Sequence, residues 1–259
     1  SFEHTSHGFR PKRSCHTALI DIQKTFTAVK WFIEGDIKGF FDNINHDVLI
    51  NILRERIADE RFLRLIRKFL NAGYVEDWVF HRTYSGTPQG GIISPILANI
   101  YLDKFDKYIK EYTNQFNKGV TRKGDARYKL YEQRRYRLAK KLKNEKNAKV
   151  REQMTAEIKR LREERNNYPA RNEMDSSIKR LKYVRYADDF LIGITGSLED
   201  CKTVKEDIKN YLNEALKLEL SDEKTLITNA QKPAKFLGYD VFIRRCNDLR
   251  KDKFGRTVR

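Results

Sequence analysis

Two adjacent carboxylates, Asp188 and Asp189, stand between two apolar runs of the chain. The runs, residues 181–186 and 190–194, have the composition of β-strands, so the pair falls at the turn of a predicted hairpin. Adjacent like charges repel each other, and a divalent cation, which favours hard oxygen ligands, relieves the repulsion. A third acid completes a two-metal site for phosphoryl transfer, and Asp36, at the end of another predicted strand, is the candidate.

The chain carries a large positive charge. Its 259 residues include 53 Lys and Arg against 36 Asp and Glu, which gives a formal net charge of +17. Such an excess favours a polyanionic partner, with nucleic acid ahead of a membrane surface. No apolar run reaches the roughly 18 residues that a membrane span needs, so no membrane partner is expected. The three cysteines have neither zinc-ligand spacing nor the even count of a disulfide framework, which fits a reducing compartment.

Strands and helices follow one another without a regular alternation, which favours an α+β fold with an antiparallel sheet. The expected helices span residues 14–22, 45–53, 61–70, 94–112 and 198–216. The expected strands span residues 31–37, 78–84, 181–186, 190–194, 218–220, 226–228 and 236–243.

Residues 118–167 differ from the rest of the chain. They contain 18 Lys and Arg against 7 Asp and Glu. Apolar residues recur in them at helical spacing along a narrow stripe, which predicts one long helix or a helical hairpin with a break near residues 144–147. The segment is interpreted as an insertion that projects from a compact body. A solvated face would explain the charge, but the charge and the tyrosines together favour contact with an RNA backbone.

Other segments offer weaker signals, each with an ordinary structural alternative. Phe41 is a rigid ring that can exclude a sugar 2′-hydroxyl, or it is a core residue after a strand. The loop 87–91 brings backbone and Gln89 close to a ligand, or it only joins a strand to a helix. Lys224 can face a leaving pyrophosphate, although a solvated surface lysine is commoner. The basic loop with Arg10 and Lys12 can hold phosphates or be solvated.

The order of these segments resembles that of the reverse transcriptases, in particular those encoded by group II introns, the maturases. The segments are Gly-Phe-Arg-Pro (8–11), Asp-x-x-x-x-Phe-Asp (36–42), Thr-Pro-Gln-Gly-Gly (87–91), Tyr-Ala-Asp-Asp (186–189), Leu-Ser-x-x-Lys-Thr (220–225) and Phe-Leu-Gly-Tyr (236–239). The resemblance therefore covers nearly the whole chain. Reverse transcriptases of retrons or diversity-generating elements are the alternatives, and the basic insertion favours the intron group.

The resemblance implies a right-hand polymerase with fingers and palm, in which an antiparallel palm sheet packs on helices and a helical basic insertion is added. Its implied parts are partial fingers (1–35), palm with fingers elements (36–113), the basic helical insertion (114–175), palm with the catalytic hairpin (176–245) and a basic tail (246–259). The chain begins without Met on a motif-like segment and stops soon after the last palm strand. We therefore expect it to be the fingers–palm part of a longer protein.

The resemblance also implies residue roles. The implied catalytic residues are Asp36, Asp188, Asp189 and Lys224. The implied substrate-binding residues are Phe41, Gln89, Ala187, Arg10 and Lys12, and Leu237 and Gly238 grip the primer. The implied metal ligands are Asp36, Ile37, Asp188 and Asp189, which hold two Mg²⁺ ions, with Mn²⁺ as a substitute.

The implied reaction is DNA synthesis on an RNA template by two-metal nucleotidyl transfer. Its implied partners are the RNA template, a DNA primer, deoxynucleoside triphosphates and structured intron RNA, with a homodimer as one option. The alternative is an RNA-binding splicing cofactor with little polymerase activity in this fragment. A bacterial cytoplasm is the expected location, ahead of an organelle.

Overall fold

The chain divides into two compact units in the computed structural model. One unit contains residues 1–117 and 179–259, and the other contains residues 118–178. The structure describes residues 2–76, 79–81, 86–87, 91–172, 175–244, 250–251 and 257–258. The insertion expected over residues 114–175 differs from the second unit by a few residues at each end. At its start, the preceding helix continues to Phe116.

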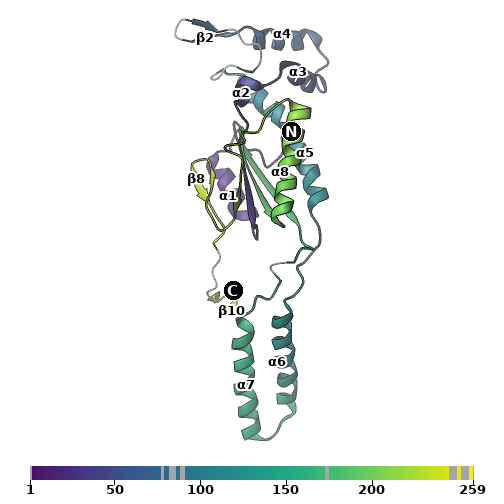
Figure 1. Ribbon diagram of the computed structural model, residues 1–259, viewed down its shortest axis with the longest axis vertical. Helices are drawn as coiled ribbons and strands as arrows, with labels where there is room; N and C mark the ends of the chain where they lie inside the picture. Colours follow the sequence, from purple (N-terminus) through teal and green to yellow (C-terminus); the bar gives the residue numbers. More distant parts are fainter. Residues whose placement is uncertain are drawn as a thin grey trace. The chain divides into compact units, whose positions relative to one another are not determined.

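The first unit is built around a four-stranded antiparallel sheet with the order β4-β5-β1-β6. The strands are β1 (Trp31–Gly35), β4 (Arg180–Tyr186), β5 (Asp189–Thr195) and β6 (Leu226–Asn229). Strand β1, from the N-terminal part of the chain, pairs with β5 on one side and β6 on the other (Figure 1). The predicted α+β fold with an antiparallel sheet is therefore confirmed.

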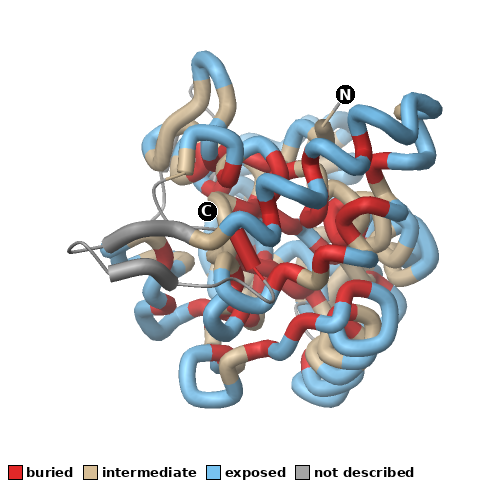
Figure 2. The backbone as a smooth tube through the Cα atoms, turned by 90° about the horizontal axis from the view of Figure 1, so that it is seen from above, coloured by how far each residue is buried: buried red, intermediate tan, exposed pale blue. Residues whose placement is uncertain are grey.

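Helices cover both faces of this sheet, so its central strands β1 and β5 are buried. Figure 2 shows buried stretches of backbone surrounded by exposed ones. Helices α5 (Ser94–Phe116) and α8 (Leu198–Leu216) lie on one face, and α1 (Cys15–Thr25) lies on the other (Figure 1). Because strand side chains alternate between faces, neighbours in one strand join different cores. Ile33 and Ile192 pack with α5 and α8, whereas Phe32 and Leu191 pack with α1.

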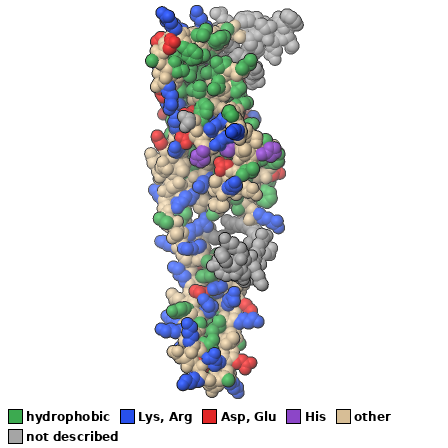
Figure 3. Space-filling view, turned by 180° about the vertical axis from the view of Figure 1, so that it is seen from behind, with side chains coloured by type: hydrophobic (Ala, Val, Ile, Leu, Met, Phe, Trp, Pro, Cys, Tyr) green, Lys and Arg blue, Asp and Glu red, His purple; other side chains and the backbone are tan. Residues whose placement is uncertain are grey.

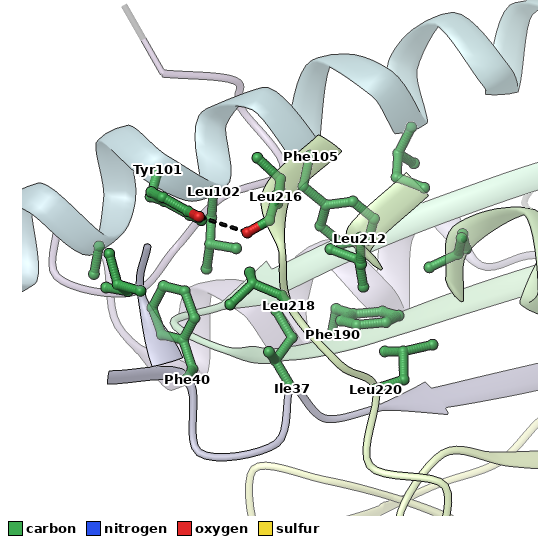
Figure 4. Close-up of a cluster of buried hydrophobic side chains, with 14 of the residues drawn as sticks. Ile37, Phe40, Tyr101, Leu102, Phe105, Phe190, Leu212, Leu216, Leu218 and Leu220 are labelled. Carbon is green, nitrogen blue, oxygen red and sulfur yellow. Dashed lines mark hydrogen bonds between the residues drawn. The ribbon is translucent and has the colours of Figure 1, made fainter. Parts of the chain in front are cut away.

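Several aromatic side chains lie among the leucines and isoleucines of the larger core, between the sheet and helices α5 and α8 (Figure 4). Phe105 of α5 is fully buried, and its ring centroid lies 5.3 Å from that of Phe190 in β5 and 5.7 Å from that of Tyr183 in β4. The hydroxyl of Tyr101 donates a hydrogen bond of 2.5 Å to the carbonyl of Leu216 at the end of α8. Strands β4 and β5 therefore pack against α5 through an aromatic cluster of Phe105, Phe190 and Tyr183.

Three helices and a small hairpin follow β1. They are α2 (Phe40–Asn43), α3 (His46–Arg54), α4 (Glu60–Asn71), β2 (Tyr74–Glu76) and β3 (Val79–His81). The side chains of Asn45 and Asp59 accept backbone N–H bonds at the starts of α3 and α4, which explains why these helices begin there. The single strand expected over residues 78–84 is in part β3, which pairs with β2; residues 78 and 82–84 lie outside the described part.

The strand expected over residues 236–243 is a hairpin instead, formed by β7 (Ala234–Phe236) and β8 (Tyr239–Val241). The turn residues Leu237 and Gly238 have φ angles of 53° and 79°, and two left-handed residues reverse the chain in a tight hairpin. The strand expected over residues 218–220 is reduced to one bridge between Leu220 and Ile37. Further along, β9 (Arg250–Lys251) pairs with β10 (Thr257–Val258).

The second unit is a helical hairpin of α6 (Ala126–Asn144) and α7 (Ala148–Asn166). Its connection falls where the break was expected, and Asn147 caps α7. Glu132 of α6 accepts hydrogen bonds from Arg135 and, at 2.6 Å, from Arg165 of α7, and these bonds lower the pKa of Glu132 to about 2. Only Leu161 is buried in either helix, so charge pairs and a narrow apolar seam hold the hairpin.

No helix in the described part of the chain is both long and apolar enough to cross a membrane.

Truncation of Phe105 tests how much this aromatic cluster stabilises the fold. Phe105→Ala removes a fully buried ring, so the free energy of unfolding is expected to fall by about 3–5 kcal/mol. Urea unfolding followed by circular dichroism measures the change. Phe62→Ala, at a site that is 43% exposed on α4, is the control and is expected to stay within about 0.5 kcal/mol of the wild type. Equal losses in the two variants would contradict this account of the core.

Candidate active site

The register of β1 against β5 brings two acidic positions together. Gly35 at the end of β1 pairs with Phe190 of β5. Because the strands are antiparallel, Asp36, which follows Gly35, lies beside Asp189 at the start of β5. The backbone carbonyl of Asp36 also accepts a hydrogen bond of 2.9 Å from the amide of Ser221. Two carboxylates more than 150 positions apart in the sequence thus meet at one edge of the sheet.

The turn between β4 and β5 holds the third acid. Tyr186 pairs with Asp189, which leaves Ala187 and Asp188 as a two-residue loop. The predicted hairpin is present, but Asp189 is the first residue of β5 and not part of the loop. Ala187 has a φ of 55°, in the left-handed region that residues with a side chain rarely adopt. The turn is therefore sharp, and it presents Asp188 and Asp189 next to Asp36.

Burial and mutual repulsion perturb these carboxyls. Burial, followed by the charges of Asp188 and Asp36, raises the pKa of Asp189 to about 6. Burial and then the charge of Asp36 raise the pKa of Asp188. Interacting groups with raised pKa values in a cleft are typical of functional sites. The strand register and the two-residue turn therefore place the three acids near one another.

Lys224 supplies a cation at this edge of the sheet. Its ammonium lies 3.0 Å from a carboxylate oxygen of Asp36, although its side chain is 70% exposed. The hydrogen bond with Asp36 raises the pKa of Lys224, so the side chain stays charged. The lysine that the sequence singled out therefore lies at the acids.

A cleft of about 450 Å³ joins the acids to the β7–β8 hairpin. Its walls include Asp36, Asp189, Lys224, Leu237 and Gly238. The structure thus brings two of the candidate acids, the candidate lysine and the two candidate primer-grip residues into one cavity.

Phe41 lies in α2, just beyond Asp36, and is partly buried. Its ring meets those of Phe40 and Phe9 edge-on, with centroids 5.3 Å and 6.3 Å away. The amide of Thr87 donates a hydrogen bond of 2.7 Å to the carbonyl of Phe41, so the start of the loop 87–91 is attached to α2. Gln89, the nucleotide-positioning candidate in this loop, lies outside the described residues.

The remaining candidates have other surroundings. Nη1 of Arg10 donates hydrogen bonds of 2.6 Å and 2.8 Å to the carbonyls of Glu3 and Ser6, so this nitrogen supports the fold of its own loop. Lys12 is exposed and has a φ of 63°. The side chain of Ile37 is buried in the larger core, which leaves only its backbone carbonyl as a ligand.

Two buried polar side chains that are not among the candidates join segments far apart in the sequence. Glu34 is buried in β1, where its carboxylate accepts hydrogen bonds from the hydroxyl of Thr228 and, at 2.7 Å, from the amide of Lys235 at β7. His46 is buried at the start of α3 and hydrogen-bonds the carbonyl of Gly86 at 2.7 Å. A glutamate inside an apolar strand is a sequence signal for Glu34; nothing in the sequence singles out His46.

In the described part of the chain, no group of three or more His, Cys, Asp or Glu side chains is preformed around a metal position. The donor set nevertheless suits a hard cation. Carboxylates are ligands of Mg²⁺, the acids repel one another, and a positive group, the ammonium of Lys224, already contacts Asp36. The residues present therefore fit divalent metal ions.

A family model described as reverse transcriptase (RNA-dependent DNA polymerase) matches residues 1–125 and 159–241. The chain belongs to the reverse transcriptase family. As a family, reverse transcriptases use divalent metal ions. The matched ranges contain every candidate site residue, and the unmatched residues 126–158 cover α6 and part of α7. The helical hairpin is thus in large part an addition to the common reverse transcriptase fold.

Two relatives support the narrower resemblance. The group II intron-encoded protein LtrA of Lactococcus lactis subsp. cremoris is 47% identical over 253 residues, which are 96% of this chain and 41% of LtrA. The putative COX1/OXI3 intron 1 protein of Saccharomyces cerevisiae is 40% identical, over 98% of this chain and 29% of that protein. The predicted resemblance to group II intron-encoded reverse transcriptases is confirmed. The chain spans less than half the length of either relative.

A solved structure shows the same fold. Telomerase from Candida albicans, in complex with the TWJ fragment of telomeric RNA, superposes with a TM-score of 0.52 at 12% identity, over 91% of this chain and 34% of that chain. At this identity the likeness concerns the fold alone. It agrees with the expected arrangement of fingers and palm.

The raised pKa of Asp189 predicts a pH-dependent penalty on stability. Because the folded pKa of about 6 exceeds the ordinary value of 3.8, ionised Asp189 destabilises the fold above pH 6, and the penalty fades as the pH falls toward 3.8. In metal-free buffer, Asp189→Asn is expected to raise the free energy of unfolding at pH 7 by roughly 1–3 kcal/mol. The gain is expected to shrink as the pH is lowered.

Urea unfolding at several pH values, with a chelator present, measures this effect. Glu214→Gln removes an exposed carboxylate from α8 and serves as the control, with little change expected at any pH. If the increase in the free energy of unfolding from Asp189→Asn does not change with pH, ionisation of Asp189 does not destabilise the fold.

Proposed function

We propose that the chain is the fingers and palm of an RNA-directed DNA polymerase of the group II intron-encoded class. One observation carries the proposal: Asp36, Asp188 and Asp189 converge at the neighbouring ends of β1 and β5, beside a cleft, in a member of the reverse transcriptase family. Such convergence has no structural benefit, since the acids raise one another's pKa values.

The proposed reaction extends a DNA primer on an RNA template with deoxynucleoside triphosphates. Asp36, Asp188 and Asp189, with the backbone oxygen of Ile37, would hold two Mg²⁺ ions, or Mn²⁺ in their place. When bound, such ions neutralise charge on the reacting phosphates and activate the attacking oxygen. The protein's own part is to position the substrates and to balance charge, because phosphoryl transfer needs little acid–base chemistry from side chains.

Other residues of the cleft have proposed roles in positioning. Phe41 would exclude the 2′-hydroxyl of a ribonucleotide, and its packing between Phe40 and Phe9 supports a rigid wall. Lys224 would stabilise the charge on the leaving pyrophosphate, which its pairing with Asp36 supports. The left-handed turn at Leu237 and Gly238 would grip the primer across the same cleft.

Further residues and regions complete the proposal. Ala187 would contact the incoming sugar, Gln89 would position the nucleotide, and Arg10 and Lys12 would contact phosphates. The proposed regions are partial fingers (1–35), palm with fingers elements (36–113), basic insertion (114–175), palm with the catalytic hairpin (176–245) and basic tail (246–259). A bacterial cytoplasm is the proposed location, and a homodimer is the proposed assembly to test.

Replacement of one acid tests the polymerase. Asp188→Asn keeps the size of the side chain but removes its charge, so the rate of primer extension on an RNA template is expected to fall at least about 100-fold. Single-nucleotide incorporation in the longest available form of the protein, with Mg²⁺ and then Mn²⁺, measures the rate. Glu214→Gln on the exposed face of α8 is the matched control. Undiminished incorporation by Asp188→Asn would remove Asp188 from the site.

A second function, binding of structured intron RNA as a splicing cofactor, has support from the helical hairpin. Residues 118–167 contain 18 basic against 7 acidic residues, a net charge of +11 from 18 − 7, and their side chains are mostly exposed. Figure 3 shows Lys and Arg side chains along the surface of α6 and α7. Phosphate contacts from such a surface give affinity that falls steeply with salt.

Removal of the hairpin separates the two functions. The side-chain oxygen of Asn117 accepts a 2.9 Å hydrogen bond from the amide of Leu181, so the chain leaves and re-enters the first unit at one place. A short Gly-Ser linker in place of residues 118–178 is expected to preserve primer extension. Intron affinity is expected to fall, and the log–log salt slope to become less negative by about 0.9 for each lost contact with duplex phosphate.

Filter binding over a range of salt concentrations measures both quantities. A variant with Lys129, Lys140, Lys141 and Lys143 of α6 changed to Gln is expected to show part of the loss, whereas Glu152, Glu157 and Glu163 of α7 changed to Gln are expected to show none. An intron affinity that survives removal of the hairpin would contradict its role as the RNA-binding surface.

A further inference from the structure

A fully buried ion pair contacts the turn between β4 and β5, which contains Ala187 and Asp188. The guanidinium of Arg185 in β4 donates to both carboxylate oxygens of Asp106 in α5, at 2.8 Å from Nε and 2.7 Å from Nη2. Neither side chain is exposed at all, and the hydroxyl of Tyr183 donates a further bond of 2.8 Å to Asp106. Desolvation makes such a pair costly, so stability alone is a weak reason for its presence.

The rest of the guanidinium reaches the turn itself. Nη1 of Arg185 donates a hydrogen bond of 2.7 Å to the carbonyl of Ala187. Ala187 is the residue whose φ of 55° makes the turn sharp, and it directly precedes Asp188. A strained backbone conformation persists only where surrounding contacts stabilise it. Here the charged guanidinium of Arg185, buried away from water, stabilises the conformation of Ala187.

The N-terminal segment closes the same arrangement from another side. Nη2 of Arg185 also donates a hydrogen bond of 2.9 Å to the hydroxyl of Ser6. The backbone amide of Arg185 donates to the carbonyl of Thr5 at 2.9 Å, and the backbone carbonyl of Arg185 accepts from the amide of His7 at 2.8 Å. A Cβ on Gly8 would lie 2.3 Å from the amide nitrogen of Ala187, so the segment packs against the turn without space for a side chain.

We propose that Arg185, oriented by Asp106, is a positioning residue that fixes the backbone of Ala187 and thereby the carboxylates of Asp188 and Asp189. The inference rests on the proposed polymerase function. Arg185 touches no substrate in this role; it acts through the turn. A lysine cannot replace it, because one ammonium cannot bond Asp106 through two parallel donors and also reach Ala187 and Ser6.

The test compares a double and a single variant. Asp106→Leu with Arg185→Met replaces the pair by apolar residues of similar size, an exchange that is often neutral or stabilising for the fold. Arg185→Lys keeps the buried charge opposite Asp106 but loses the fork. In both variants kcat for primer extension is expected to fall about 100-fold, as for a small misplacement of catalytic groups, while KM for the primer–template is unchanged.

Hydrogen exchange followed by mass spectrometry provides a readout that does not depend on activity. In both variants, peptides covering residues 186–190 are expected to exchange faster than in the wild type, while peptides covering β1 keep the wild-type rate. The control is Tyr112→Phe, which removes a 2.7 Å hydrogen bond to Asp207 elsewhere in the first unit. It is expected to leave both kcat and exchange at the turn unchanged.

Wild-type exchange at the turn together with wild-type kcat in Arg185→Lys would overturn the proposal. So would equal loosening of the turn and of β1, because the pair would then serve the fold as a whole. If the double variant does not fold, Arg185→Lys decides by the same two criteria. Absence of primer extension in the wild type would count against the polymerase function, whereas the exchange data would still decide the role of Arg185.

Discussion

The antiparallel pairing of β1 with β5 brings the three proposed catalytic acids together. With Gly35 opposite Phe190, Asp36 is placed beside the turn that carries Asp188 and Asp189. A shift of one residue would turn the side chains of a strand to the opposite face and separate the acids. The larger core favours this register, because Ile33 of β1 and Ile192 of β5 are both buried in it. Core packing and chemistry are therefore linked through one strand pair.

Much of this site could be predicted from the sequence, because its signals are local. The apolar runs around Asp188 and Asp189 indicate a hairpin, which β4 and β5 form. The helical hairpin follows from apolar spacing and a break near residues 144–147. The strand-end position made Asp36 a candidate, and the resemblance to a family implied its role beside these acids, since nothing local specifies a contact between distant strands.

What the sequence did not predict are contacts that exist only in the folded chain. Arg185 is next to an obvious motif, yet its position beside Asp106 depends on how α5 packs on the sheet. The β7–β8 hairpin was expected as one strand, because a leucine with positive φ is seldom assumed at Leu237. The bond of His46 to the carbonyl of Gly86 likewise joins segments that no periodicity connects.

The bond between Asn117 and Leu181 has a consequence for how such proteins can diverge. The two segments that connect the first unit to the helical hairpin leave and re-enter that unit side by side. Whole helical turns can therefore be gained or lost in the hairpin without a shift in the strand pairing of the sheet. The length of the helical hairpin can therefore differ between related proteins while Asp36, Asp188 and Asp189 keep their places in the sheet.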